Sequence, residues 1–479
     1  MIKMKRLYSL ALFLTLSLTL SSHPWKPSHY VIIDSDGGTD DLMAITMLLA
    51  SPDVRVLGII ASPGTLDAER AYIKIRSLLN SFYHEGIPVG INMECQFKSP
   101  EFEVALNYRW GEETGVDPSD APGYIQVISN IIKYEKTTIS FICLGGLSTV
   151  TGALKQIPDF GSALKEIIWS CGGKDDRKGF NFNIDSSSAL SILGGKIPVK
   201  TIHRSGQIKF YDSSFISSAD SINTVYARKM VGFQKSPAAI NHGFSSLLTD
   251  EMVPLFLHFP EAFTLQNSGL VTDCAPSDWQ MIRNGYLKIL KGSTVMKNQV
   301  IKVLPSDPEF YYSDVAPFVK DIIDRYGENE WAAGVLANEL HRHLGVFAIV
   351  GVKMGIRARE YFDTGVDEFR AVSHAGSEPP LSCMNDGLQV STGATPGHGL
   401  LTVFNDSISM PVAEFTYMNN RIRLSLKPEI ASKIKNELKD INFVYGLDSN
   451  IYWELVRKNS LKYWKELDRH NIFSIEVLN

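Results

Sequence analysis

The chain has 479 residues, 44% of them hydrophobic, and a formal net charge of −5 at pH 7. This length and composition predict well-folded globular units, two domains or more, and the charge balance lacks the basic footprint of a nucleic-acid-binding protein. The five cysteines are widely spaced and odd in number, so a disulfide framework does not define the fold.

The first 22 residues have the pattern of a secretory signal peptide. A basic start at 1–6 precedes an apolar run at 7–20 and two serines. That run is short for a membrane span, although an uncleaved anchor is the alternative, and no later stretch is long enough to cross a bilayer. We therefore expect residues 1–22 to be removed and the mature protein to be secreted or periplasmic, with no membrane attachment.

Residues 31–41 are the stretch around which the prediction of function is built. A β-branched apolar run leads into four carboxylates within eight residues, Asp34, Asp36, Asp40 and Asp41, and a helix-periodic apolar run follows. This pattern predicts a strand, a tight loop and a helix, with the loop where α/β sheets bind ligands. Carboxylates this close repel one another unless a cation offsets them, and oxygen ligands favour Ca²⁺ or Mg²⁺ over zinc. Helix capping would explain one aspartate, not four.

Strand-like and helix-like runs alternate beyond this stretch. Residues 54–60 and 87–89 predict strands on either side of a helix, and the alternation continues through the first part of the chain. We therefore predict an α/β domain at 29–292, built on a mostly parallel, doubly wound sheet. Tyr108 and Trp110, in a polar loop, are candidates for stacking on a base, although local packing is the more frequent role of such aromatics.

The segment 34–41, Asp-Ser-Asp-Gly-Gly-Thr-Asp-Asp, closely resembles the signature of the nucleoside hydrolases, Asp-x-Asp-x-Gly-x-Asp-Asp. The resemblance implies an N-glycoside hydrolase that depends on Ca²⁺. It also implies that Asp36, Asp41, the backbone carbonyl of Leu144 and Asp250 hold the ion, and that Asp36 is the general base. From the residues alone, Leu144 fits an ordinary strand-to-helix turn and Asp250 fits a helix N-cap equally well.

The same resemblance implies the substrate ligands. Asp40 and Asn181 would hold the sugar, with Asn183 as a further candidate, although Asn181 also suits a turn. Thr65 stands where the family usually has Asn, and Thr249 where many members have a His that helps to protonate the leaving base. Because the metal ligands match the family better than the sugar ligands do, the substrate need not be an ordinary ribonucleoside.

After a connector at 293–327 the composition changes, and a smaller α+β domain is predicted at 328–479. The segment at 341–345 and the run Cys-Met-Asn-Asp-Gly-Leu-Gln at 383–389 resemble the FmdE-like family of formylmethanofuran dehydrogenase proteins. Its motif is specific in the second segment and partial in the first. The resemblance suggests a second metal site, for zinc or another transition metal. Its candidate ligands are His341, His343 and Cys383. Ordinary surface and core roles are the alternative, since histidines two apart on a regular helix point away from each other.

Together these patterns predict a secreted, calcium-dependent hydrolase that cleaves a nucleoside or related N-ribosyl compound into sugar and base, fused to a metal-binding domain. The alternative is a calcium-stabilised sugar- or nucleoside-binding module that has lost catalysis. The expected partner is a small nucleoside-like molecule and not a nucleic acid. The sequence leaves open whether the chain forms a homo-oligomer.

Overall fold

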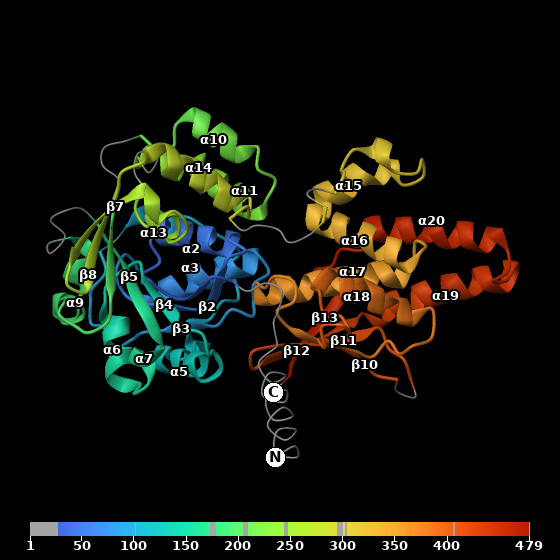
Figure 1. Cartoon of the computed structure of the whole chain (residues 1–479), viewed down its shortest axis with the longest axis horizontal. Coiled ribbons are helices and arrows are strands. Elements are labelled where there is room, and N and C mark those ends of the chain that lie inside the picture. The colour runs from blue at the N-terminus through green and yellow to red at the C-terminus, as the bar shows by residue number, and fades with distance from the viewer. Residues whose placement is uncertain are drawn as a thin grey trace, which may run out of the picture.

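The computed structural model contains two α/β units, each with its own sheet and hydrophobic core (Figure 1). The predicted signal peptide, 1–22, lies outside the described residues. No helix within the described part of the chain is both long and apolar enough to cross a membrane. The structure describes residues 27–100, 102–172, 179–204, 209–243, 248–294, 300–301, 304–405 and 408–478.

The first sheet has eight strands in the order β3-β2-β1-β4-β5-β6-β8-β7. All neighbours pair in parallel except β7 and β8, so the predicted mostly parallel, doubly wound sheet is confirmed. Strands are added to opposite sides of β1, which makes the carboxyl ends of β1 and β4 a topological switch point, where open α/β sheets bind ligands. The strands are β1 (His29–Ser35), β2 (Val54–Ala61), β3 (Val89–Ile91), β4 (Ile139–Cys143), β5 (Leu164–Gly172), β6 (Val199–His203), β7 (Phe263–Ser268) and β8 (Val271–Pro276).

Helices cover both faces of this sheet (Figure 1). Val31 and Ile33 pack into the core on one face, with α2, α3, α11, α13 and α14, whereas Ile32 packs into the core on the other, with α5, α6 and α9. The alternation follows from the two-residue period of a strand. These helices are α2 (Thr39–Ala50), α3 (Ala68–Ser81), α5 (Tyr124–Tyr134), α6 (Ser148–Gln156), α9 (Ser186–Leu193), α11 (Val225–Gln234), α13 (Met252–His258) and α14 (Trp279–Leu290).

The second unit has a five-stranded sheet in the order β10-β9-β11-β12-β13. Only β9 and β10 pair in parallel, so the sheet of this second, smaller domain is mixed. Helix α17 is almost wholly buried against α16 and α18. Its elements are α15 (Ala316–Tyr326), α16 (Glu328–His341), α17 (Val346–Phe362), β9 (Arg370–Ser373), α18 (Met384–Thr392), β10 (Leu401–Val403), β11 (Val412–Tyr417), β12 (Asn420–Leu426), α19 (Pro428–Tyr445), α20 (Asn450–Glu466) and β13 (Phe473–Leu478).

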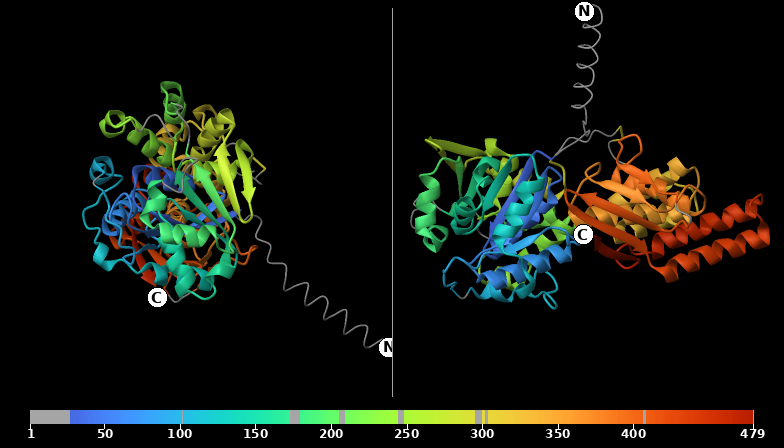
Figure 2. Two further views of the ribbon diagram at one scale, coloured as in Figure 1. Left: turned by 90° about the vertical axis from the view of Figure 1, so that its left-hand side faces the viewer. Right: turned by 90° about the horizontal axis from the view of Figure 1, so that it is seen from below.

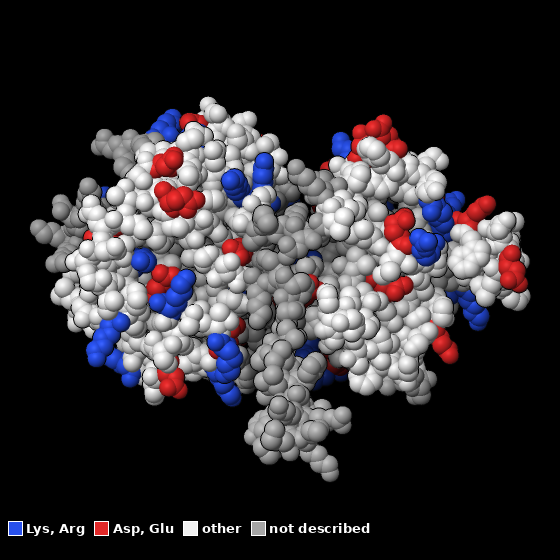
Figure 3. Space-filling view, in the orientation of Figure 1, with Lys and Arg blue, Asp and Glu red and all other residues white. Residues whose placement is uncertain are grey.

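The turn between α3 and β3 carries contacts from the first unit to the second, and the views in Figures 1 and 2 place the two units side by side. The backbone N–H of Gly86 donates to the carbonyl of Tyr361 at 2.8 Å. The ring of Tyr83 stacks on His470 with 3.4 Å between ring centroids. On the face drawn in Figure 3, acidic and basic side chains are interspersed over both units.

The aromatic residues of the loop before α5 have a packing role. Trp110 is 1% exposed, and its ring lies 5.1 Å from that of Phe233 on α11. Tyr108 packs on the same ring at 4.8 Å. Local packing, the more frequent role given to such aromatics, is therefore the role of Trp110, and the half-buried Tyr108 packs on the same ring.

Candidate active site

The loop at the end of β1 presents the motif aspartates at the switch point of the sheet. β1 ends at Ser35 and α2 begins at Thr39, with Gly37 in the left-handed region at φ 77°. The N-cap of α2 is Gly38, which makes no side-chain capping bond. No aspartate side chain of the motif therefore caps the N-terminus of this helix.

Three carboxylates from two distant segments meet there. Oxygens of Asp40, Asp41 and Asp250 all lie within 4.8 Å of one another. Asp250 precedes α13, whose N-cap is Glu251, so the helix-capping alternative for Asp250 does not hold. Asp36 is buried beside them, and its backbone N–H donates to Asp41 Oδ1 at 2.9 Å. The structure thus places Asp41 and Asp250, two of the predicted metal ligands, side by side although they are more than 200 positions apart in the sequence.

Two serine hydroxyls hold these carboxylates in place. Ser35 Oγ donates to Asp41 Oδ1 at 2.7 Å, and Ser170 Oγ at the end of β5 donates to Asp250 Oδ1 at 2.5 Å. Sequence reasoning missed both serines. Ser35 was recognisable from its place between two motif aspartates. Ser170 required knowledge of the strand order, because its partner lies 80 residues further along the chain.

The buried carboxylates resist ionisation. Burial, and then the charge of Asp40, raise the pKa of Asp36 to about 6. Burial and the charge of Asp36 raise the pKa of Asp34 to about 7, against the hydroxyls of Thr149 and Ser62. Burial first, with the neighbouring carboxylates, also raises the pKa values of Asp41 and Asp250 well above the ordinary range. A divalent cation would offset this negative charge, and an all-oxygen donor set suits Ca²⁺ or Mg²⁺.

The carbonyl of Leu144 lies at the end of β4, next to the motif strand. The Leu144 N–H donates to the Asp34 carbonyl at 2.9 Å, which extends the pairing of β1 and β4. Asn181 Nδ2 donates to the carbonyls of Leu144 at 2.7 Å and Ser170 at 2.9 Å. Asn181 therefore joins the ends of β4 and β5, from helix α8 (Phe180–Ile184). A carbonyl oxygen has two lone pairs, so the Leu144 carbonyl retains capacity for a metal.

The remaining predicted substrate ligands are Thr65, Thr249 and Asn183. Thr65 faces Asp36 and lines a cavity of about 530 Å³ together with Asn92. Thr249 precedes Asp250, and its N–H donates to Glu251 Oε2 at 3.1 Å. Asn183 is exposed on α8.

Glu251 is a further buried carboxyl beside the site. Tyr211 Oη donates to Glu251 Oε1 at 2.5 Å. Burial raises the pKa of Glu251 to about 7, against the hydrogen bond from Tyr211. Its place directly after Asp250 was visible in the sequence, but its partner comes from a different segment.

The candidate ligands in the second unit are partly brought together. His341 ends α16, and Arg342 follows in the left-handed region at φ 66°, so the chain turns back and the rings of His341 and His343 lie 4.2 Å apart. The expectation that these two rings point apart is wrong for this reason. His341 Nδ1 pairs with Asp386 at 2.7 Å. Among the described residues, ligand atoms of His341, His343 and Cys383 do not gather within 4.8 Å, and their metal binding stays a prediction.

Two family models match the chain. Residues 31–270 match the inosine-uridine preferring nucleoside hydrolase family. Residues 340–443 match the family described as FmdE, molybdenum formylmethanofuran dehydrogenase operon.

Individual proteins resemble the first unit. A protein named probable uridine nucleosidase 1 from Oryza sativa subsp. japonica is 25% identical over 251 residues, which are 49% of this chain and 75% of that protein. The pyrimidine-specific ribonucleoside hydrolase RihA of Klebsiella pneumoniae is 22% identical over 254 residues, 49% of this chain and 81% of that protein. Among solved structures, a plant nucleoside hydrolase, the PpNRh1 enzyme, aligns with a TM-score of 0.47 at 16% identity, over 55% of this chain and 99% of that chain.

The family match spans strands β1 to β7 together with the aspartate motif and Asp250, the residues that form the carboxylate cluster. The second match begins near the end of α16 and includes α17 and α18. The chain therefore belongs to the inosine-uridine preferring nucleoside hydrolase family, a family of N-glycosidase-type hydrolases, and carries an FmdE domain behind its hydrolase domain.

Proposed function

We propose that the first domain is a calcium-dependent N-glycosidase that hydrolyses a nucleoside or a related N-ribosyl compound into sugar and free base. The observation that carries this proposal is the cluster of Asp40, Asp41 and Asp250, whose oxygens lie within 4.8 Å at the switch point of the sheet. Members of this family bind Ca²⁺. The buried, oxygen-only donor set fits that ion.

In this proposal Asp36, Asp41, Asp250 and the Leu144 carbonyl hold the ion. A bound Ca²⁺ would orient and polarise a water molecule and the vicinal hydroxyls of the sugar. Asp36 would accept the proton of that water as general base. Asp40, which is less deeply buried than Asp36 and Asp41, hydrogen-bonds the sugar hydroxyls.

The reacting carbon passes through an oxocarbenium-like state, as in other glycoside hydrolyses. Water attacks the anomeric carbon, the bond from this carbon to the base nitrogen breaks, and the base leaves with that electron pair. Thr65 connects the carboxylates to the cavity of about 530 Å³, which would hold part of the substrate beyond the sugar. Asn181, Asn183 and Thr249 are proposed as further polar contacts around the substrate.

One observation favours a second candidate, a calcium-stabilised binding module that has lost catalysis. The side-chain amide of Asn181 donates to two backbone carbonyls, Leu144 and Ser170, instead of being held free for a sugar hydroxyl. A module of this kind would bind a ribosyl compound without cleaving it.

The test is release of free sugar from a panel of purine and pyrimidine nucleosides by the purified chain, with Ca²⁺ and with a calcium chelator. The proposal predicts release from at least one nucleoside and its loss with chelator. Nucleoside binding in calorimetry without release, under conditions where calcium is bound, would overturn hydrolysis in favour of the binding module.

We further propose that the protein acts outside the cytoplasm. The support is the sequence pattern of residues 1–22 alone. Expression of the full chain in a bacterial host, followed by N-terminal sequencing of the periplasmic fraction, tests it. A mature protein that begins shortly after residue 22 is expected, and an unprocessed chain in the cytoplasm would contradict export.

A further inference from the structure

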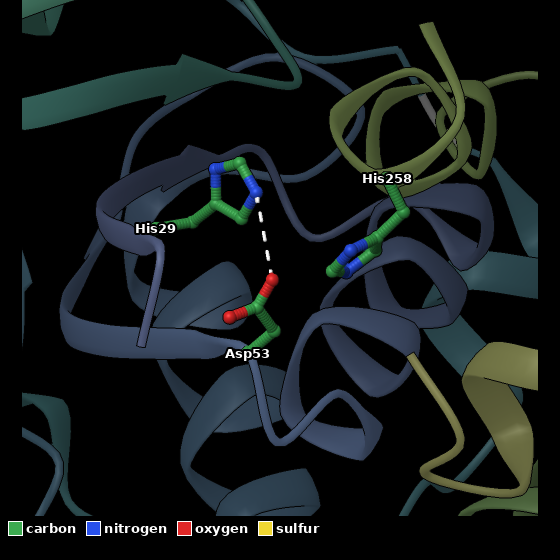
Figure 4. Close-up of side chains that lie close together, drawn as sticks. All are labelled: His29, Asp53 and His258. Atoms are coloured by element: carbon green, nitrogen blue, oxygen red, sulfur yellow. Dashed lines mark ion pairs between the residues drawn. The ribbon is translucent and has the colours of Figure 1, made fainter. Parts of the chain in front are cut away.

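Two histidines and an aspartate converge at the end of the first sheet that lies opposite the carboxylate cluster (Figure 4). His29 is the first residue of β1, Asp53 lies in the turn between α2 and β2, and His258 is the last residue of α13. A strand rises about 3.3 Å per residue, so roughly 17 Å of β1 separates His29 from Asp34. This cluster is therefore distinct from the proposed calcium site.

The three side chains offer their ligand atoms to a common point. One atom of each residue lies within 4.8 Å of the corresponding atoms of the other two. His29 Nε2 is 3.9 Å from Asp53 Oδ2, and the two imidazole rings are 5.5 Å apart and nearly perpendicular. Figure 4 shows both histidines extending toward the Asp53 carboxylate, from two different elements.

The surroundings keep the carboxylate in place and the imidazoles neutral. The backbone N–H of Ser28 donates to Asp53 Oδ1 at 2.9 Å, which leaves Oδ2 directed to His29. Burial lowers the pKa of His258 to about 4, and burial also lowers the pKa of His29. Both rings are therefore neutral near pH 7, which is the form that binds a metal.

The polar atoms of the cluster are incompletely satisfied. His258 Nε2 and His29 Nδ1 are buried and have no hydrogen-bond partner among the described residues. A buried polar nitrogen left unpaired destabilises the folded state. A cation held between the rings would satisfy at least one imidazole nitrogen and would also offset the charge of Asp53.

We propose that His29, Asp53 and His258 form a binding site for a divalent transition-metal ion of the zinc type. Two imidazole nitrogens and one carboxylate oxygen are a donor set that zinc uses, with a fourth position left for water. Tetrahedral ligands about 2.0–2.1 Å from zinc lie roughly 3.3 Å apart. The 3.9 Å gap between His29 Nε2 and Asp53 Oδ2 closes to this value by a small side-chain rotation.

An ion at this point would join three segments of the hydrolase domain. It would tie the start of β1 and the turn before β2 to the end of α13. Helix α13 directly follows Asp250 and Glu251, so the ion would fix the helix that positions one member of the carboxylate cluster. The expected consequence is a more stable hydrolase domain, with no direct contact to the substrate.

The experiment titrates the metal-stripped full chain with Zn²⁺ alone, in the presence of excess Ca²⁺ to fill the carboxylate cluster. His258→Gln and His29→Gln remove one ligand each, and His242→Gln, an exposed histidine, is the matched control. We expect the wild type and the control to bind Zn²⁺ with a rise in Tm. The two site variants should lose one equivalent of Zn²⁺, or bind it at least about 100-fold more weakly, and lose that rise.

Co²⁺ replaces Zn²⁺ in a second measurement, which separates this site from one that uses Cys383. A histidine and carboxylate site gives cobalt d–d bands without a thiolate-to-cobalt charge-transfer band. Equal Zn²⁺ stoichiometry and equal Tm shifts in the wild type and both variants would overturn the proposal, as would binding that always carries the thiolate band. If a histidine variant fails to fold, Asp53→Asn, which keeps the acceptor for Ser28, and X-ray absorption of the zinc-loaded wild type decide the ligand set.

Discussion

Arg55 on strand β2 pairs with Glu368 of the second domain, its Nε donating to Glu368 Oε2 at 2.7 Å. The two side chains are only 4% and 9% exposed, so the ion pair is withdrawn from solvent. Arg55 Nη1 also donates to the carbonyl of Asp363 at 3.0 Å. One guanidinium therefore links the strand beside the motif strand to the second domain through two separate acceptors.

Removing this arginine should destabilise the whole chain. Arg55→Met leaves Glu368 buried without its partner, and the free energy of unfolding should fall by about 3 kcal/mol. Chemical denaturation of the full chain measures the change. Arg70→Met, at an exposed pair with Asp67, is the control and should change stability by no more than about 0.5 kcal/mol. Equal stability of the two variants would show that the interdomain pair contributes nothing.

A largely buried carboxylate within the second domain should govern stability in acid. Burial alone would raise the pKa of Glu360, but the hydrogen bond from His470 and the charge of Arg469 outweigh it and lower the pKa to about 2. A lowered folded-state pKa stabilises the fold above the ordinary value of 4.5, and this contribution disappears as the pH falls toward 2.

The corresponding variant is Glu360→Gln. It should lower the free energy of unfolding at pH 7 by roughly 2 kcal/mol and flatten its decline between about pH 4.5 and 2. Unfolding curves across that range measure both effects. Glu476→Gln, at an exposed carboxylate, should keep the wild-type decline. A Glu360→Gln curve parallel to the wild type would refute the role of this carboxyl.

The proposed general base gives a prediction for activity. Asp36→Asn removes the proton acceptor and a calcium ligand, so the rate of sugar release should fall at least about 100-fold. Circular dichroism and Tm should stay close to the wild type, because the amide keeps the size of the carboxylate. Asp117→Asn, at an exposed carboxylate that accepts from the Ser119 N–H, serves as the control and should retain the rate. Undiminished sugar release by Asp36→Asn would exclude Asp36 as the base.

Ser170 is predicted to act through Asp250 as a positioning residue. Ser170→Ala removes the hydrogen bond at 2.5 Å and should weaken calcium binding about 10–100-fold. Isothermal titration with Ca²⁺ measures this, and saturating Ca²⁺ should restore most of the rate. Ser162→Ala, whose hydroxyl donates to the Asp159 carbonyl at the surface, should bind Ca²⁺ like the wild type. Unchanged affinity in Ser170→Ala would remove Ser170 from the site.

The sequence was sufficient to predict the strand, loop and helix around the motif because the pattern of each element lies within the element itself. The apolar run before Asp34 and the periodic run after Asp41 define a strand and a helix within a single stretch, and the structure has β1 and α2 there. The alternation of strands and helices likewise predicted the sheet type. The order of the strands places Ser170 beside Asp250. This order depends on packing between distant segments, so no single segment of the sequence predicts it.

Contacts between distant segments and a chain reversal account for what the sequence analysis left open or predicted wrongly. Trp110 is covered by Phe233, a residue more than 100 positions away, so the sequence near Trp110 could not decide between packing and stacking on a base. The expectation that the rings of His341 and His343 point apart was wrong because Arg342 adopts the left-handed conformation and ends the helix between them. His29 and His258 were not noticed at all, since nothing near either residue indicates that β1 and α13 bring them together.

The contacts from Arg55 and Gly86 lie at the starts of β2 and β3, while the aspartates follow the far end of β1. In a parallel sheet the starts and the carboxyl ends of the strands lie at opposite ends of the sheet. The contacts formed by Arg55 and Gly86 therefore hold the FmdE domain at the end of the sheet opposite the carboxylate cluster.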